Sequence, residues 1–236
     1  MSNWRLIVLA MMTSLALCGF ALADNAPVEI HPPAPKPRPK DPKPAVPAPA
    51  AKPGISSAEA VHRANAWFDN ARTAIADFVQ VGPDGHRAQG RLEWERPGRL
   101  RFQFSPPDRL EIVADGRSIA VRDQKMDTQD LYLIAQTPLK FLLADHFDLS
   151  RDTQVLNVDT NSDKAVSILI EDKATFGGSA QIELLFDPAT FALKQWTVND
   201  AQGAQTVVSL FDIDLATKPD EAEFKIDEHV MIGPKH

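Results

Sequence analysis

Between residues 56 and 75, apolar side chains recur at the spacing of one helix face. Ser56 and Glu59 have the spacing of a capping box, in which two side chains satisfy free backbone N–H groups at a helix start. The apolar positions that follow share one stripe, and they are Val61, Ala64, Phe68, Ala71 and Ile75, with Trp67 beside them. The pattern predicts an amphipathic helix that packs this stripe on a sheet.

From Asp77 onward the period of the apolar positions changes to two, which is typical of strands with one buried face. The alternating sets are Leu92/Trp94, Leu100/Phe102/Phe104, Leu110/Ile112, Ile119/Val121, Val166/Ile168/Ile170, Ile182/Leu184/Phe186, Trp196/Val198 and Val207/Phe211/Ile213. Turn signals such as Pro97-Gly98 and Asp115-Gly116 separate them. The spacing predicts a mainly β domain of about 10 or 11 short antiparallel strands in a sandwich or barrel-like sheet.

One short helical pattern interrupts the strands. Thr137 and Pro138 suit the N-cap and first position of a helix. The apolar residues that follow form a stripe, and they are Leu139, Leu142, Leu143 and Phe147. A helix this short is not stable alone, so we expect it to lie on an apolar surface. The segment between Asp145 and Asp159 leaves little room for a further helix.

A curled, half-open sheet has a concave face that needs a cover, and the short helix is the candidate lid. Burying that face under two or three helical turns contributes on the order of 5–10 kcal/mol before ordering costs. An apolar guest such as an acyl chain can compete for the same surface, which makes the lid a two-state element biased by ligand. An ordinary filled core would produce the same periodicity.

The N-terminus has the pattern of a secretory signal. Arg5 supplies the charge, Leu6 to Leu17 the apolar region, and the small residues Ala21 and Ala23 a cleavage site, so residues 1–23 are expected to be removed. Lipidation of Cys18, the only cysteine, is an alternative, although Leu17 before it is larger than acylation sites favour. A retained N-terminal membrane anchor is a third possibility.

Residues 24–54 are expected to be an extended, basic linker, followed by one folded domain over residues 55–236. The stretch from Pro27 to Pro53 holds 11 of the 19 prolines, five basic residues and two acidic ones. Gly54 to His236 then carries the acidic excess, a net charge of −10 within the formal −7 of the chain, because Arg5 and Asp24 cancel. Such a domain is a poor nucleic-acid binder. The basic arm is either a plain linker or a contact for anionic lipid or acidic polymer.

Nothing in the sequence predicts an enzyme, a metal site or a cofactor. The six histidines are dispersed without metal-ligand spacing. No Gly-x-Ser-x-Gly elbow or glycine-rich phosphate loop occurs, and Ser56 is explained as a helix cap.

Four segments together resemble the periplasmic outer-membrane lipoprotein carrier protein family (LolA). They are Gly90 to Pro97 (GRLEWERP), Leu100-Arg101-Phe102, Ile112 to Gly116 (IVADG), and Thr137-Pro138-Leu139 with Leu142-Leu143. With the leading helix and the strands that follow, the resemblance spans roughly residues 55–227. It implies an incomplete antiparallel β-barrel of about 10–11 strands whose hydrophobic cavity is closed by a helical lid.

The resemblance also implies a function. Members of this family receive acylated lipoproteins from an inner-membrane ABC exporter and deliver them to an outer-membrane acceptor. The chain is then expected to be a monomeric periplasmic carrier that works by opening and closing its lid. The alternatives are a membrane-anchored acceptor of the same fold, or an envelope scaffold that binds no lipid and uses its Pro-rich arm.

By position in the Arg-Pro motif, the resemblance gives Arg96 the role of a latch that donates hydrogen bonds to lid backbone. Without that role Arg96 would be a surface arginine near a hairpin turn. The residues expected to line the cavity or form the lid are Trp94, Leu100, Phe102, Phe104, Ile112, Leu131, Leu139, Leu142, Leu143, Phe147, Ile168 and Trp196.

Overall fold

A computed structural model describes residues 55–173 and 178–226 of the chain. The expected signal sequence and Pro-rich linker lie outside the described residues. Within the two described ranges, no helix has the length and apolar character needed to cross a membrane.

Eleven strands form one antiparallel sheet. They are β1 (Thr73–Val81), β2 (Arg87–Glu95), β3 (Arg99–Phe104), β4 (Leu110–Asp115), β5 (Ser118–Asp123), β6 (Thr128–Leu133), β7 (Gln154–Asp159), β8 (Val166–Asp172), β9 (Ala180–Phe186), β10 (Leu193–Asn199) and β11 (Gln205–Asp214). Their order is β6-β5-β4-β3-β2-β1-β11-β10-β9-β8-β7, so β6 and β7 are the two edges and the sheet is not closed. The prediction of an incomplete antiparallel barrel is confirmed.

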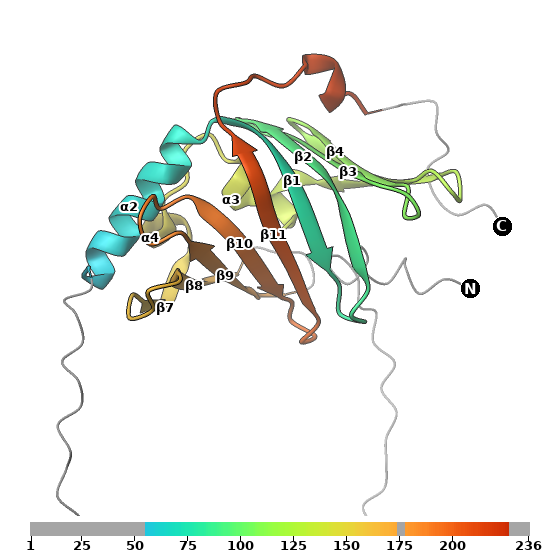
Figure 1. Cartoon of the computed structure of the whole chain (residues 1–236). Helices are drawn as coiled ribbons and strands as arrows, with labels where there is room; N and C mark the ends of the chain where they lie inside the picture. Colours follow the sequence, from blue (N-terminus) through green and yellow to red (C-terminus); the bar gives the residue numbers. More distant parts are fainter. Residues whose placement is uncertain (1–54, 174–177, 227–236) are drawn as a thin grey trace, which may run out of the picture. The chain divides into compact units, whose positions relative to one another are not determined.

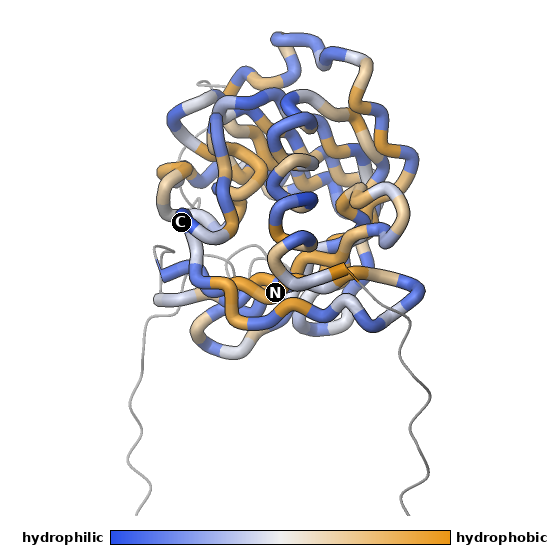
Figure 2. Tube along the Cα trace, turned by 90° about the vertical axis from the view of Figure 1, so that its left-hand side faces the viewer, coloured by the Kyte–Doolittle hydropathy of each residue, from blue (hydrophilic) through white to orange (hydrophobic). Residues whose placement is uncertain are grey.

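The strands bury alternate residues on one face, and Figure 2 shows hydrophobic and hydrophilic positions alternating along them. On β11 the predicted face is wrong for Val207 and Phe211, whereas Ile213, which follows a bulge, packs against the core as predicted. Val208 and Leu210 point into the core, whereas the side chain of Phe211 is 49% exposed. The register explains the difference, because Leu210 pairs with the buried Phe78 of β1, and a shift of one residue exchanges the two faces.

Helix α2 (Ser57–Asn70) begins as predicted, with the Ser56 hydroxyl accepting a hydrogen bond from the Glu59 N–H at 3.2 Å. Its end was predicted too far along the chain. The helix stops at Asn70, and Ile75 lies in β1 opposite Glu93 of β2. The strand wins there because β1 pairs along its whole length with β2, while continuing the helix would forfeit that ladder.

The lid region differs from the prediction at its start. Thr137 follows a 3₁₀ turn, η1 (Ile134–Gln136), and its hydroxyl donates to the Ile134 carbonyl at 3.0 Å. Helix α3 (Lys140–Leu143) begins after Leu139, without a side-chain cap. A further one-turn helix, α4 (Leu149–Asp152), follows in a segment that was expected to leave little room for one, and Asp148 caps it. We use the term lid segment for residues 137–152.

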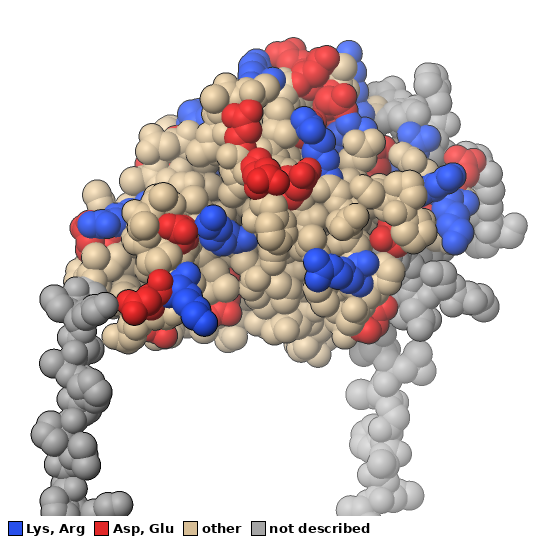
Figure 3. All heavy atoms as spheres, in the orientation of Figure 1, with Lys and Arg blue, Asp and Glu red and all other residues tan. Residues whose placement is uncertain are grey.

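Figure 1 shows α3 within the curve of the sheet, with α2 and α4 beside it. On the outer face, the 3₁₀ helix η2 (Glu221–Phe224) lies over β3 and β4 and buries Phe224. Arg101 of β3 forms ion pairs with Glu111 and Glu223 there. In the space-filling view of Figure 3, side chains of both charges are scattered over the visible face. The buried apolar cluster includes residues of the strands, of α2 and of α3.

Candidate functional site

The lid segment fills the concave face of the sheet with apolar side chains. Phe141, Leu142 and Leu143 of α3 are all at most 2% exposed. The ring of Phe141 packs at a steep angle against Trp196 of β10, with centroids 5.7 Å apart, and against Phe68 of α2 at 6.1 Å. A helix of four residues cannot hold this position by itself, so these contacts keep it in place.

All but one of the predicted cavity and lid residues meet in this region. Eleven of them belong to one hydrophobic cluster or pack against it, and they are Trp94, Leu100, Phe102, Phe104, Ile112, Leu139, Leu142, Leu143, Phe147, Ile168 and Trp196. Leu131 of β6 does not join them, since its side chain is 42% exposed. Its neighbour Tyr132 pairs with the buried Ile119 and takes the inward position, so Leu131 points to the outer face.

Arg96 fastens the lid segment from the end of β2. Its side chain is buried, and its guanidinium donates three hydrogen bonds to backbone carbonyls. Nε donates to Leu142 at 2.9 Å, one terminal nitrogen to Phe141 at 2.6 Å, and the other to Phe68 of α2 at 2.8 Å. The Arg96 side chain thus connects the end of β2 to both α2 and α3. The planar, forked guanidinium suits this arrangement, which an ammonium group could not reproduce.

The charge on Arg96 is costly to bury. Burial lowers its pKa to about 10, and the nearby positive charge of Arg72 adds to the effect, whereas Asp69 and Asp145 oppose it. The guanidinium also lies 5.5 Å from the ring centroid of Phe68, within the range of a cation–π contact. Arg96 therefore depends on its three carbonyl partners to remain in this environment.

An ion pair fastens the other end of α3. The Nζ atom of Lys140 lies 2.6 Å from Oδ1 of Asp172, the last residue of β8, whose side chain is 2% exposed. Asp172 continues the inward row of Val166, Ile168 and Ile170. Since β2 and β8 lie in different halves of the sheet order, α3 is tied to both halves.

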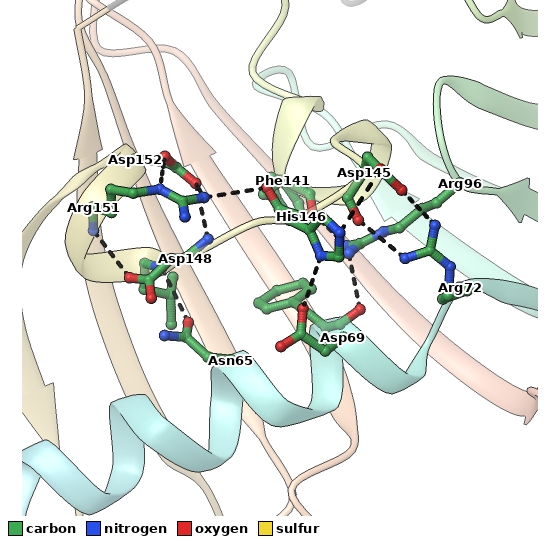
Figure 4. A network of polar contacts seen from close by, with 12 residues as sticks. Asn65, Asp69, Arg72, Arg96, Phe141, Asp145, His146, Asp148, Arg151 and Asp152 are labelled. Carbon is green, nitrogen blue, oxygen red and sulfur yellow. Dashed lines mark hydrogen bonds and ion pairs between the residues drawn. The ribbon is translucent and has the colours of Figure 1, made fainter.

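Polar contacts also join the lid segment to α2 and to Arg72, which lies between α2 and β1, and Figure 4 shows them together. Arg72 forms an ion pair with Asp145, and this hydrogen bond lowers the pKa of the Asp145 carboxyl. His146 lies 3.9 Å from Asp69 of α2. The Leu149 N–H donates to the side-chain oxygen of Asn65 at 3.0 Å, which satisfies a backbone group at the start of α4.

Several of these residues were not predicted from the sequence. Phe141 was omitted because Leu139, Leu142 and Leu143 were taken as the single apolar face of the helix. In the fold α3 is enclosed on more than one side, so Phe141, Leu142 and Leu143 are all buried. The Lys140–Asp172 pair joins residues 32 positions apart, and no local pattern indicates such a contact.

Two grooves lie at the surface of the described residues. One of about 340 Å³ is polar and is lined by residues that include Lys140, Arg151 and Asp172. Another of about 610 Å³ lies between Leu131 and Phe224 on the outer face. Among the described residues, no group of three or more His, Cys, Asp or Glu side chains could hold a metal ion. The candidate site is the apolar concave face that α3 covers.

Comparison with known proteins gives a consistent family. Residues 69–227 match the family model described as outer membrane lipoprotein carrier protein LolA. An outer-membrane lipoprotein carrier protein from Azotobacter vinelandii is 22% identical over 189 residues, which cover 74% of this chain and 87% of that protein. One from Chromobacterium violaceum is 38% identical over 74 residues, or 30% of this chain and 36% of that protein.

Among solved structures, a LolA superfamily protein from Nitrosomonas europaea is similar to this chain. It is 12% identical, with a TM-score of 0.41, and the match covers 72% of this chain and 98% of that one. The family model spans well over half of the 236 residues. The chain therefore belongs to the outer-membrane lipoprotein carrier protein family, LolA.

Proposed function

We propose that this protein is a periplasmic carrier that binds the acyl chains of lipoproteins on the concave face of its sheet after α3 has moved aside. The observation that carries the proposal is the way α3 is held. Three apolar side chains of a four-residue helix fill the concave face, while a buried arginine holds the backbone of the same helix. The hydrogen bonds that hold α3 are separate from the ladder that pairs the strands, so α3 can be released without breaking the sheet.

The energies of the two occupants are comparable. Burying three large apolar side chains of α3 contributes roughly 5–9 kcal/mol. A palmitoyl chain has about 14 methylene groups, and full burial contributes about 0.8 kcal/mol for each, or roughly 11 kcal/mol. One acyl chain therefore provides as much apolar burial as α3, and cargo with two or three chains provides more. Because the guest substitutes for protein side chains, exchange of occupants is reversible.

Arg96 sets the balance between the two occupants in this proposal. Its hydrogen bonds to Phe141 and Leu142 exist only when α3 is closed, so they stabilise the cargo-free form. The latch keeps the concave face covered until cargo arrives. Cargo would come from an inner-membrane ABC exporter and leave to an outer-membrane acceptor.

The test is binding of a triacylated lipopeptide by the purified mature protein, measured by native mass spectrometry. We expect a one-to-one complex with the triacylated peptide and none with the same peptide lacking acyl chains. The peptide-only probe is the matched control, because it keeps every polar group of the cargo except those of the chains. Binding of neither probe would contradict the proposal.

The two alternative functions predict different material from cells. A carrier should have a free Asp24 at its N-terminus, whereas a membrane-anchored acceptor should carry acyl groups on Cys18, and mass analysis of the N-terminus distinguishes them. An envelope scaffold isolated from the periplasm should carry no bound lipid. Native mass spectrometry of protein isolated from the periplasm separates the scaffold from the carrier.

A further inference from the structure

The indole N–H of Trp196 is a buried hydrogen-bond donor that lacks an acceptor among the described residues. Its side chain is fully buried on β10, and within the described part of the chain its indole nitrogen Nε1 has no hydrogen-bond partner. Indole N–H groups in protein interiors usually find an acceptor, because an unmet donor loses its bond to water without replacement. The unmet donor at Trp196 therefore requires an explanation.

Trp94 shows how the same side chain is accommodated elsewhere in the core. It is also fully buried, and its Nε1 donates to the Ala71 carbonyl at the end of α2, at 2.9 Å. Both tryptophans are buried in the same hydrophobic cluster, yet only Trp94 has an acceptor for its indole N–H. The orphan donor is thus a property of the site around Trp196 and not of buried tryptophan in this fold.

The surroundings of Trp196 place it directly beneath the lid segment. Phe141 of α3 meets its ring edge to face with centroids 5.7 Å apart, and Phe102 of β3 meets it in the same manner at 6.4 Å. Aromatic rings offer an N–H group only a weak contact. When α3 moves away, Phe141 leaves with it, so the indole becomes part of the surface that a guest meets first.

We propose that the Trp196 indole N–H donates a hydrogen bond to an ester carbonyl of the diacylglyceryl group of a lipoprotein cargo. This inference rests on the proposed function and specifies the chemistry that the site recognises. Ester carbonyls are the acceptors that diacylglyceryl groups carry where their acyl chains begin. A guest made only of hydrocarbon would leave the donor unmet, so the indole favours glycerolipid esters over plain alkyl chains.

The experiment compares two lipopeptides with the same peptide and the same chain lengths. One has ester-linked glyceryl chains, and the other has ether-linked chains that lack the carbonyls. One net buried hydrogen bond corresponds to about 3- to 10-fold in the dissociation constant. We expect the wild-type protein to prefer the ester by that factor, and Trp196→Phe to bind both lipopeptides equally.

Trp67→Phe is the matched control. Trp67 is a buried tryptophan of α2 that is not among the predicted cavity and lid residues, so this variant loses core packing as Trp196→Phe does but should keep the ester preference. A second measurement needs no variant. The ¹H–¹⁵N signal of the Trp196 indole should move downfield with the ester lipopeptide and not with the ether lipopeptide.

Each outcome decides the matter. Equal affinity of the wild type for ester and ether lipopeptides, or an ester preference that survives in Trp196→Phe, overturns this inference and leaves the carrier function standing. An indole signal that is already hydrogen-bonded without cargo and does not move overturns it in favour of a buried water. Failure of the wild type to bind either lipopeptide overturns the carrier function and this inference together.

Discussion

Replacing Arg96 with leucine should release α3 while preserving the sheet. The guanidinium donates two hydrogen bonds to α3, to the carbonyls of Phe141 and Leu142. Hydrogen bonds from a charged donor contribute about 1.5–3 kcal/mol each, so these two contribute about 3–6 kcal/mol. The buried charge opposes them, because the lowering of the Arg96 pKa to about 10 corresponds to roughly 3 kcal/mol. The difference, of order 2 kcal/mol, is the net stabilisation of the closed position.

Hydrogen exchange of backbone amides measures this loss where it occurs. The N–H groups of Leu142 and Ala144 donate to the carbonyls of Leu139 and Lys140 at 2.9 and 2.8 Å, and both bonds break when α3 unfolds or leaves. A loss of about 2 kcal/mol should accelerate their exchange about 30-fold in Arg96→Leu. Arg87→Leu is the control, since Arg87 is an exposed arginine of β2, the strand that Arg96 follows.

Two results would refute the latch. Exchange at Leu142 and Ala144 could be the same in Arg96→Leu and in the wild type, which would mean that the apolar contacts alone hold α3. Alternatively, exchange could accelerate equally throughout β8 and β9, which would make Arg96 a general stabiliser of the fold and not a fastening of the lid segment.

Two further predictions concern the other contacts of the lid segment. Lys140→Met removes the cation 2.6 Å from the buried Asp172 and should lower the free energy of unfolding, measured in urea, by about 3 kcal/mol. The double variant Lys140→Met with Asp172→Asn should recover most of that loss, because it also removes the buried negative charge. A double variant as unstable as the single one would contradict this. The Asp145 carboxyl has a pKa below 3.8 in the folded protein, chiefly because of its hydrogen bond from Arg72, so its contribution to stability is present above pH 3.8 and is lost as the pH falls through the folded pKa. The difference in melting temperature between the wild type and Asp145→Asn should therefore shrink below pH 3.8, and a difference that stays constant with pH would count against the pair.

The fold class could be predicted from the sequence because the strands that carry it are amphipathic. In β3, β8 and β9 the buried residues alternate without a break, so the period of two is easy to recognise. The edge strands β6 and β7 were not among the alternating sets. Leu131, Leu133 and Leu156 are exposed there, and an edge strand with apolar residues on its outer side loses the simple pattern.

The site was predicted less completely because its contacts are long-range. The role of Arg96 was predicted only from the resemblance to a family, since an arginine before a proline does not by itself indicate a contact with the lid segment. The start of α3 was misplaced because Thr137 and Pro138 suit a helix start locally, yet in the fold Thr137 follows the turn η1 and donates to Ile134. Lys140–Asp172 and Asn65–Leu149 depend on tertiary packing, which no window of sequence contains.

The central claim, that α3 gives way to acyl chains, can be tested most directly by measuring the position of the lid segment with and without cargo. The distance between the lid segment and the sheet can be measured between two spin labels. One replaces His146, which follows α3 and has a side chain that is 72% exposed, and the other replaces the exposed Gln181 of β9. Triacylated lipopeptide should produce a second, longer distance population, and the unacylated peptide should not. An unchanged distance distribution in protein saturated with the triacylated lipopeptide would contradict the claim.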